Sequence, residues 1–123
     1  MVHEVKGVEV EGFRGGKGKG IRYEIVPKEE LYGHGRLYAR MVLYPGSSIG
    51  WHQHINDTEP YYILRGEGDF IEGDSENGER KVTRVHAGDV CTIKIGQWHS
   101  MENNSDCELE FMALIYNKEG YLS

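Results

Sequence analysis

The chain has 123 residues, the length of one domain, and its 38% hydrophobic and 28% charged residues are typical of a globular protein rather than a disordered one. Its formal net charge of −6 argues against nucleic-acid binding, because an acidic surface repels the phosphate backbone. No apolar run approaches the roughly 20 residues that cross a bilayer, and residues 1–6 lack the apolar core of a signal peptide. We therefore expect a cytoplasmic protein that binds neither nucleic acid nor membranes.

The two cysteines support a reducing compartment. Cys91 and Cys107 lie far apart in the chain and do not form a CxxC motif. Without an export signal we expect both thiols to be reduced. Cys91 lies in an apolar stretch, which suits a buried thiol.

Residues 1–20 are predicted to form an N-terminal arm, and residues 21–123 the barrel domain. The arm contains a stretch from Arg14 to Gly20 that is rich in glycine and lysine. A phosphate-binding Walker loop requires a different glycine spacing and Ser or Thr after its lysine, whereas Gly18 follows Lys17 here. We therefore interpret this stretch as a flexible or subunit-crossing loop.

From residue 21 onward, short apolar or alternating stretches separated by glycine, proline and asparagine predict one strand after another. One helical turn is expected at residues 28–32, and a hairpin turn at residues 73–78. The strands are expected at residues 21–25, 37–44, 59–65, 69–71, 80–85, 90–95, 100–103 and 109–116. No segment keeps an apolar pattern of helical period over ten or more residues, so the predicted fold class is all-β.

Two of these strands, at residues 61–64 and 111–115, are apolar on both faces. In a sheet, such a pattern means that one face fills a barrel while something covers the other. In so small a domain we expect the cover to be a second subunit. The sequence thus predicts a barrel or jelly roll that forms a homodimer through a sheet.

A metal site is indicated by His52 and His54. Residues two apart on a strand project from the same face, so their imidazoles can converge on one ion. Residues 56–58 have the composition of a turn, which would bring the Glu59 carboxylate beside the histidines. The His-x-His pair is weak evidence by itself, but His99 follows a later glycine-bounded strand.

With these residues in this order, the sequence resembles the cupin superfamily, whose two motifs span residues 46–103. The first motif is matched in residue type and spacing by Gly46, His52, His54, Glu59 and Gly66, and the second by Gly88, Gly96, His99 and Asn103. Lys94 stands where the family usually has proline, a position that shapes a turn and is not a ligand. The resemblance implies a single-domain double-stranded β-helix, or jelly-roll barrel, with His52, His54, Glu59 and His99 as metal ligands.

Three imidazoles and one carboxylate suit one divalent transition metal per chain, namely Mn, Fe, Co, Ni, Cu or Zn. Four protein ligands on a six-coordinate ion leave positions open for water or a substrate, as metal catalysis requires. A closed site that only stiffens the barrel is the alternative. Structural zinc sites favour cysteine-rich tetrahedra, and neither cysteine is near these residues in the sequence.

Strand alternation extends the site to a pocket, although core packing is the alternative for every residue in it. Tyr61 lies two residues after Glu59, so its side chain should point inward as well, and its hydroxyl could reach the metal ligands. Tyr62 and Leu64 should point outward. The residues assigned to the pocket are Tyr61, Ile63, Met101, Phe111 and Ala113, with Ile115 on the same face of the last strand.

The resemblance leaves the function open, because cupins host many chemistries. One hypothesis is a metal-dependent oxidoreductase, decarboxylase, isomerase or lyase that acts on a small oxygenated or carboxylate molecule. The other is a protein that binds a small carboxylate or sugar on the metal without turnover. Small single-domain relatives include oxalate-decarboxylase-like proteins. The decarboxylases themselves have two cupin domains and a glutamate lid, so this resemblance does not transfer their activity to a chain with one domain and no identifiable lid.

Overall fold

The computed structural model describes residues 1–119, which form eleven strands and two short 3-10 turns. The turns are η1 (Phe13–Gly15) and η2 (Lys28–Leu31). The strands are β1 (Val8–Glu11), β2 (Lys19–Glu24), β3 (Gly35–Leu43), β4 (Ser48–Gln53), β5 (Asp57–Thr58), β6 (Tyr61–Arg65), β7 (Glu67–Gly73), β8 (Lys81–His86), β9 (Val90–Cys91), β10 (Trp98–Glu102) and β11 (Leu109–Asn117). Within this part of the chain, no helix has the length and hydrophobicity needed to span a bilayer.

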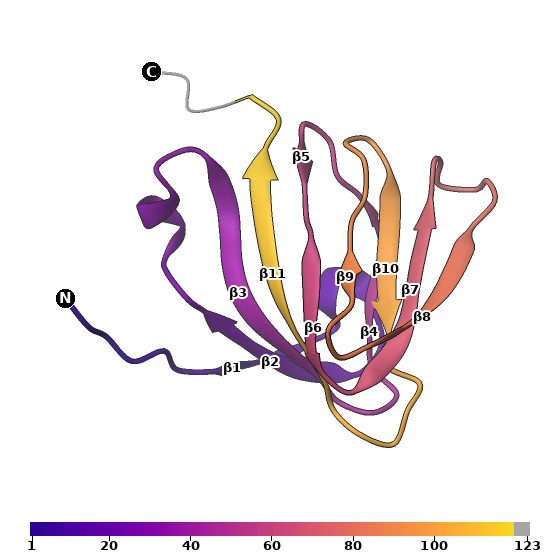
Figure 1. Ribbon diagram of the computed structural model, residues 1–123, viewed down its shortest axis with the longest axis horizontal. Helices are drawn as coiled ribbons and strands as arrows, with labels where there is room; N and C mark the ends of the chain where they lie inside the picture. Colours follow the sequence, from indigo (N-terminus) through magenta and orange to yellow (C-terminus); the bar gives the residue numbers. More distant parts are fainter. Residues whose placement is uncertain (120–123) are drawn as a thin grey trace.

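The strands form two antiparallel sheets that face each other (Figure 1). Sheet A has the order β1-β2-β3-β11-β6-β9, with β5 paired to β11, and sheet B has the order β4-β10-β7-β8. Strands distant in the sequence are neighbours in both sheets, for example β3 beside β11 and β4 beside β10. The all-β jelly-roll barrel predicted from the sequence is confirmed.

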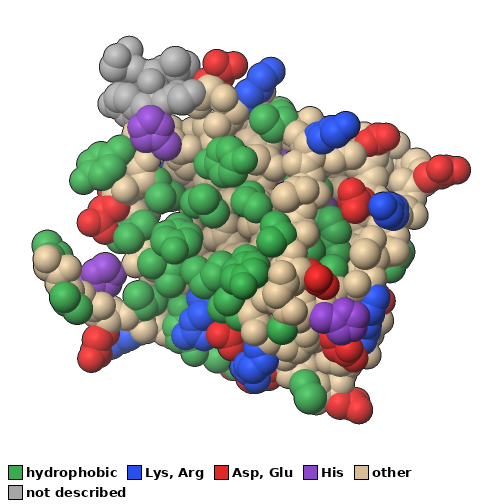
Figure 2. Space-filling view, viewed as in Figure 1, with side chains coloured by type: hydrophobic (Ala, Val, Ile, Leu, Met, Phe, Trp, Pro, Cys, Tyr) green, Lys and Arg blue, Asp and Glu red, His purple; other side chains and the backbone are tan. Residues whose placement is uncertain are grey.

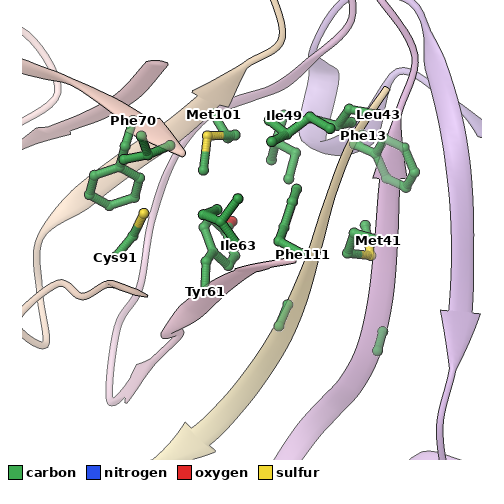
Figure 3. Close-up of a cluster of buried hydrophobic side chains, with 14 of the residues drawn as sticks. Phe13, Met41, Leu43, Ile49, Tyr61, Ile63, Phe70, Cys91, Met101 and Phe111 are labelled. Atoms are coloured by element: carbon green, nitrogen blue, oxygen red, sulfur yellow. The ribbon is translucent and has the colours of Figure 1, made fainter. Parts of the chain in front are cut away.

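The interior of the barrel is apolar because alternate residues of each strand point into it. On β6 and β11 the side chains of Tyr61, Ile63, Phe111 and Ala113 are almost completely buried. Met101 on β10 packs into the same cluster from sheet B (Figure 3). This core joins the two sheets.

The structure shifts the predicted boundaries near the site. The strand expected at residues 59–65 begins at Tyr61, because Pro60 has no N–H to donate to a ladder. Asn56 has a left-handed conformation with a φ of 64°, as a turn requires. Asp57 and Thr58, expected as part of that turn, form the short strand β5.

The glycine-rich stretch of the predicted arm lies directly on β4. The N–H of Ser48 donates to the carbonyl of Lys17 at 2.9 Å, and the N–H of Lys17 donates to the Ser48 hydroxyl at 2.9 Å. A Cβ atom at Gly16 would clash with the Ser48 carbonyl, so only glycine permits this close approach. In the chain, β1 precedes this stretch and β2 follows it, and the two strands extend one edge of sheet A. Residues 8–24 thus close one side of the barrel.

Candidate metal centre

The four predicted metal ligands meet inside the barrel. His52 lies on β4 and His54 directly after its end, so both side chains point to the same side. His99 on β10 is the cross-strand partner of His52, and Glu59 lies just before β6 of the other sheet. None of the four residues is more than 7% exposed.

Their donor atoms have the separations that a single ion imposes. The three histidine Nε2 atoms lie 3.0 to 3.2 Å from one another. Glu59 Oε1 lies 3.2 Å from Nε2 of His54, 3.3 Å from that of His99 and 3.9 Å from that of His52. An ion about 2.1 Å from two nitrogens at right angles separates them by about 3.0 Å. His52, His54, Glu59 and His99 are therefore a group able to hold a metal ion.

The second ring nitrogen of two histidines is held by a hydrogen bond. His52 Nδ1–H donates to the carbonyl of Gly50 at 2.7 Å, and His54 Nδ1–H donates to the carboxylate of Asp57 at 2.7 Å. A proton on Nδ1 leaves Nε2 unprotonated and ready to bind a metal. His99 Nδ1 is buried without a hydrogen-bond partner in residues 1–119.

Asp57 was missed by the sequence analysis, in which it was only a turn residue. Its Oδ2 accepts a hydrogen bond from Arg36 Nε at 2.9 Å, while its Oδ1 accepts from His54. The chain of contacts from Arg36 through Asp57 to His54 fixes the plane of the imidazole ring. A carboxylate behind a metal-binding histidine commonly orients the ring and makes its nitrogen a stronger ligand.

The protonation states of two of the ligands suit a metal. Burial lowers the pKa of His99 to about 4, so its ring is neutral at physiological pH. Burial alone would raise the pKa of Glu59. The three neighbouring histidines, which can donate to the ionised carboxylate when they carry a proton on Nε2, outweigh this effect and hold the pKa of Glu59 well below the usual range. A neutral imidazole and an ionised carboxylate are the forms that bind transition metals.

Tyr61 contacts two of the four predicted ligands. Its hydroxyl donates to Glu59 Oε1 at 3.1 Å, and its ring stacks on that of His99 with centroids 5.2 Å apart. Burial, and then the nearby Glu59 carboxylate, raise the pKa of Tyr61 well above its ordinary value. Tyr61 is therefore a neutral hydrogen-bond donor to Glu59.

A cavity of about 380 Å³ opens beside the metal-binding group. The charged side chains that line it, apart from Glu59, are Arg14, Arg22, Glu24 and Arg36. Its apolar wall consists of Val10, Phe13, Leu37, Met41, Ile49 and Ile115. The cavity is thus part cationic and part apolar, with His52, His54, Glu59 and Tyr61 on one side.

Of the five residues assigned to the pocket from the sequence, Tyr61 lines the cavity. The structure places Ile63, Met101, Phe111 and Ala113 in the apolar core and not in the cavity wall. Strand alternation distinguishes inward from outward side chains, but it does not say how far along the barrel each one lies. Much of the wall comes instead from residues 10–24, which carry no local sequence signal for a site.

Comparison with known proteins agrees with this fold. The family model described as a cupin domain matches residues 39–115, and the chain belongs to this family. It is 43% identical over 112 residues to a protein of Thermotoga maritima named oxalate-binding protein, covering 91% of this chain and 88% of that one. The crystal structure of a predicted oxalate decarboxylase from Thermotoga maritima superposes with a TM-score of 0.83 at 42% identity, covering 93% of this chain and 94% of the other.

A more distant structural neighbour shares only the fold. The cupin domain of Drosophila melanogaster CENP-C has a TM-score of 0.71 at 16% identity, covering 91% of this chain and 70% of that one. The barrel therefore does not identify a function, which has to be argued from the site.

Proposed function

We propose that this protein binds a small carboxylate of the oxalate class on a divalent transition-metal ion held by His52, His54, Glu59 and His99. The observation that carries the proposal is the convergence of four buried donor atoms beside a cavity with arginines in its wall. The name of the Thermotoga maritima relative supports the same class of ligand. We propose one ion per chain, chosen from Mn, Fe, Co, Ni, Cu and Zn.

The surroundings of the site favour an anionic ligand with oxygen donors. A bound divalent ion would accept carboxylate oxygens at the positions that the protein leaves open. The apolar side of the cavity lowers the local dielectric constant, which strengthens the attraction between opposite charges. Arg14, Arg22 and Arg36 add positive charge to the wall. Tyr61 keeps the Glu59 carboxylate in place through its hydroxyl.

Thermal unfolding with and without metal tests this function. Oxalate at about 100 times its Kd should stabilise the metal-loaded protein by about 2.7 kcal/mol and so raise its melting temperature. The metal-free protein should not respond, because the ligand then has no ion to bind. Acetate, which cannot chelate as oxalate does, is the control. An equal shift with and without metal would contradict the proposal.

Catalysis is the second candidate function, and the position of Glu24 in the cavity wall favours it. This carboxylate lines the cavity without belonging to the metal-binding group, so it is placed to exchange protons with a bound molecule. Tyr61 is less suited, since its raised pKa keeps the proton on its hydroxyl. Decarboxylation or oxygen uptake that is lost in Glu24→Gln while metal content is retained would indicate an enzyme. Ligand-induced stabilisation without turnover across a panel of small acids would indicate a binding protein.

We also propose that the protein forms a homodimer through the outer face of sheet A. Figure 2 shows hydrophobic side chains gathered over this face. The large exposed ones on β3, β6, β9 and β11 are Tyr38, Tyr62, Leu64, Val90, Leu114 and Tyr116. Cross-strand pairing joins Leu114 to Tyr38, Met112 to Tyr62 and Tyr62 to Val90, so apolar residues are neighbours across β3, β11, β6 and β9. A second copy of the chain would remove this surface from water.

A reducing compartment such as the cytoplasm remains our proposal for location. Cys91 and Cys107 are both free thiols. Burial raises the pKa of Cys91 to about 12, which makes it inert, but Cys107 is exposed. An exposed free thiol persists best where disulfides do not form.

A further inference from the structure

The stretch between Gly12 and Gly18, interpreted above as a flexible or subunit-crossing loop, has a defined structure with Arg14 near its centre. We propose that Arg14 is a specificity-determining residue that binds the carboxylate oxygens of the ligand that do not coordinate the metal. This inference rests on the proposed function, since it needs a carboxylate held by the ion. It adds a second anion-binding group, on a segment without metal ligands.

The backbone of Arg14 is the first observation. Arg14 has a left-handed conformation, with a φ of 51° and a ψ of 35°. For a residue other than glycine this conformation costs about 1 to 2 kcal/mol. The loop has glycine at positions 12, 15, 16 and 18, yet arginine occupies this strained position. A non-glycine side chain at a position where glycine would be unstrained points to a role for that side chain.

The second observation is that the loop holds the backbone of Arg14 in a fixed place. Phe13 is buried in the core and anchors the loop to it. Two backbone hydrogen bonds close it, from Gly15 N–H to the carbonyl of Gly12 at 3.0 Å and from Gly12 N–H to the carbonyl of Gly18 at 2.9 Å. A Cβ atom on Gly50 of β4 would clash with the carbonyl of Arg14, so the two backbones lie in direct contact. Arg14 is therefore held two residues along β4 from the level of His52.

The third observation is that two of the arginines around the cavity have no ion-pair partner in residues 1–119. The side chains of Arg14 and Arg22 make no hydrogen bond or ion pair with any residue in the range 1–119, whereas Arg36 is bound to Asp57. Three arginines and two glutamates line this cavity in a chain whose net charge is −6. The guanidinium group presents paired N–H donors that match a carboxylate. Two arginines without protein partners beside a cavity thus form a site for an anion.

The size of the cavity is consistent with a ligand that reaches beyond the metal. Its volume of about 380 Å³ equals that of about a dozen water molecules at about 30 Å³ each. A two-carbon dicarboxylate has only six non-hydrogen atoms and would leave much of this space to water. The site therefore has room for dianions somewhat longer than oxalate.

Isothermal titration calorimetry on the metal-loaded protein tests this assignment. Oxalate and malonate carry two charges, while glycolate chelates a metal in the same way as oxalate but carries one. Arg14→Gly should weaken oxalate and malonate binding at least tenfold and glycolate binding less than threefold. Arg14→Lys should be intermediate, because lysine retains the charge and loses the paired donors. The matched control is Lys17→Gln, which removes one positive charge from the same loop outside the cavity wall and should bind all three acids as the wild type does.

Arg14→Gly is expected to fold at least as well as the wild type, since glycine adopts the left-handed conformation without strain. Its ligand-free melting temperature and its metal content should therefore be unchanged or higher. Oxalate affinity equal to that of the wild type would overturn the inference, as would an equal loss in Lys17→Gln or an equal loss for glycolate. If the wild type with metal bound none of the acids, the proposed function would fall together with the inference. If the wild type bound the acids and Arg14→Gly bound them equally well, only the inference about Arg14 would be overturned, and the proposed function would stand.

Discussion

His54 is held on both sides of its imidazole ring. Nε2 faces the other metal-binding atoms, while Nδ1–H donates to Asp57, which is itself bound by Arg36. Burial favours a neutral ring. Hydrogen bonds to Glu59 and Asp57 outweigh this effect, so the pKa of His54 is raised above its ordinary value. The same two carboxylates that orient the ring for a metal therefore also attract a proton to it.

Removing the carboxylate behind His54 should weaken metal binding. Asp57→Ala frees the ring to rotate and leaves Nδ1–H without its acceptor, so we expect a 10- to 100-fold loss of metal affinity, about 1.4 to 2.8 kcal/mol. Competition with a chelator measures this affinity. Asp69→Asn is the control, because Asp69 is ion-paired to Arg84 away from the metal-binding group. Equal affinities in Asp57→Ala and the wild type would show that the hydrogen bond has no positioning role.

Acid should release the metal, because a proton and the ion compete for the same histidine nitrogens. The raised pKa of His54 makes it take up a proton at a higher pH than His99, whose pKa is about 4. We expect full occupancy at pH 8 and progressive loss as the pH falls below about 6. Elemental analysis after gel filtration at each pH measures the occupancy. Full retention at pH 4.5 would contradict this competition.

At the scale of elements, the two faces of each strand in sheet A have different surroundings. On β6, Tyr61 and Ile63 are buried while Tyr62 and Leu64 are exposed, as the alternation in the sequence predicts. On β11, Leu114 is likewise exposed between buried neighbours. The inward faces build the core, and the outward faces build the apolar surface proposed as the dimer interface.

A charge on this outer face should separate the subunits. Leu64→Lys places an ammonium group in the proposed interface, where it would lose its hydration without gaining a partner. Light scattering should give a mass near twice 14.0 kDa for the wild type and close to 14.0 kDa for the variant. Val82→Lys is the control, since Val82 is exposed on β8 of the other sheet and should leave the dimer intact. A folded wild-type monomer at micromolar concentration would exclude the interface.

At the scale of the whole molecule, the metal-binding group connects the two sheets. His52 and His99 come from β4 and β10 of sheet B, while Glu59 directly precedes β6 of sheet A. An ion bound by all of them would fasten one sheet to the other. Metal binding should therefore stabilise the entire barrel rather than a single loop.

Removal of the ion should lower the melting temperature of the protein. If the free metal stands at about 1,000 times its Kd, the bound ion contributes about 4.1 kcal/mol to the free energy of unfolding. Protein purified without chelator should contain about one ion per chain, and the variants His52→Ala and His99→Ala should lose most of it. A chelator should then lower the melting temperature of the wild type but have no effect on either variant. Unchanged metal content in both variants would contradict the site.

The sequence alone determined the fold class and the metal-binding group. Alternating apolar residues and frequent glycines are local signals, because the period of a strand is set by its own backbone. His52 and His54 share a face for the same reason. Glu59 and His99 were predicted as ligands because their spacing from nearby glycines follows the cupin motifs, and the structure brings both beside His52 and His54.

The cavity wall was decided by the tertiary structure. Arg14 and Arg22 reach the site because β1 and β2 pair with each other and then with β3, and no short-range pattern in residues 1–24 specifies that pairing. Ile63 and Met101 have the inward position expected of pocket residues, yet they pack in the core. Asp57 looks like any turn residue in the sequence and becomes the partner of His54 only when the chain folds. Strand alternation specifies which way a side chain points. The residues that surround that side chain depend on contacts between segments far apart in the chain.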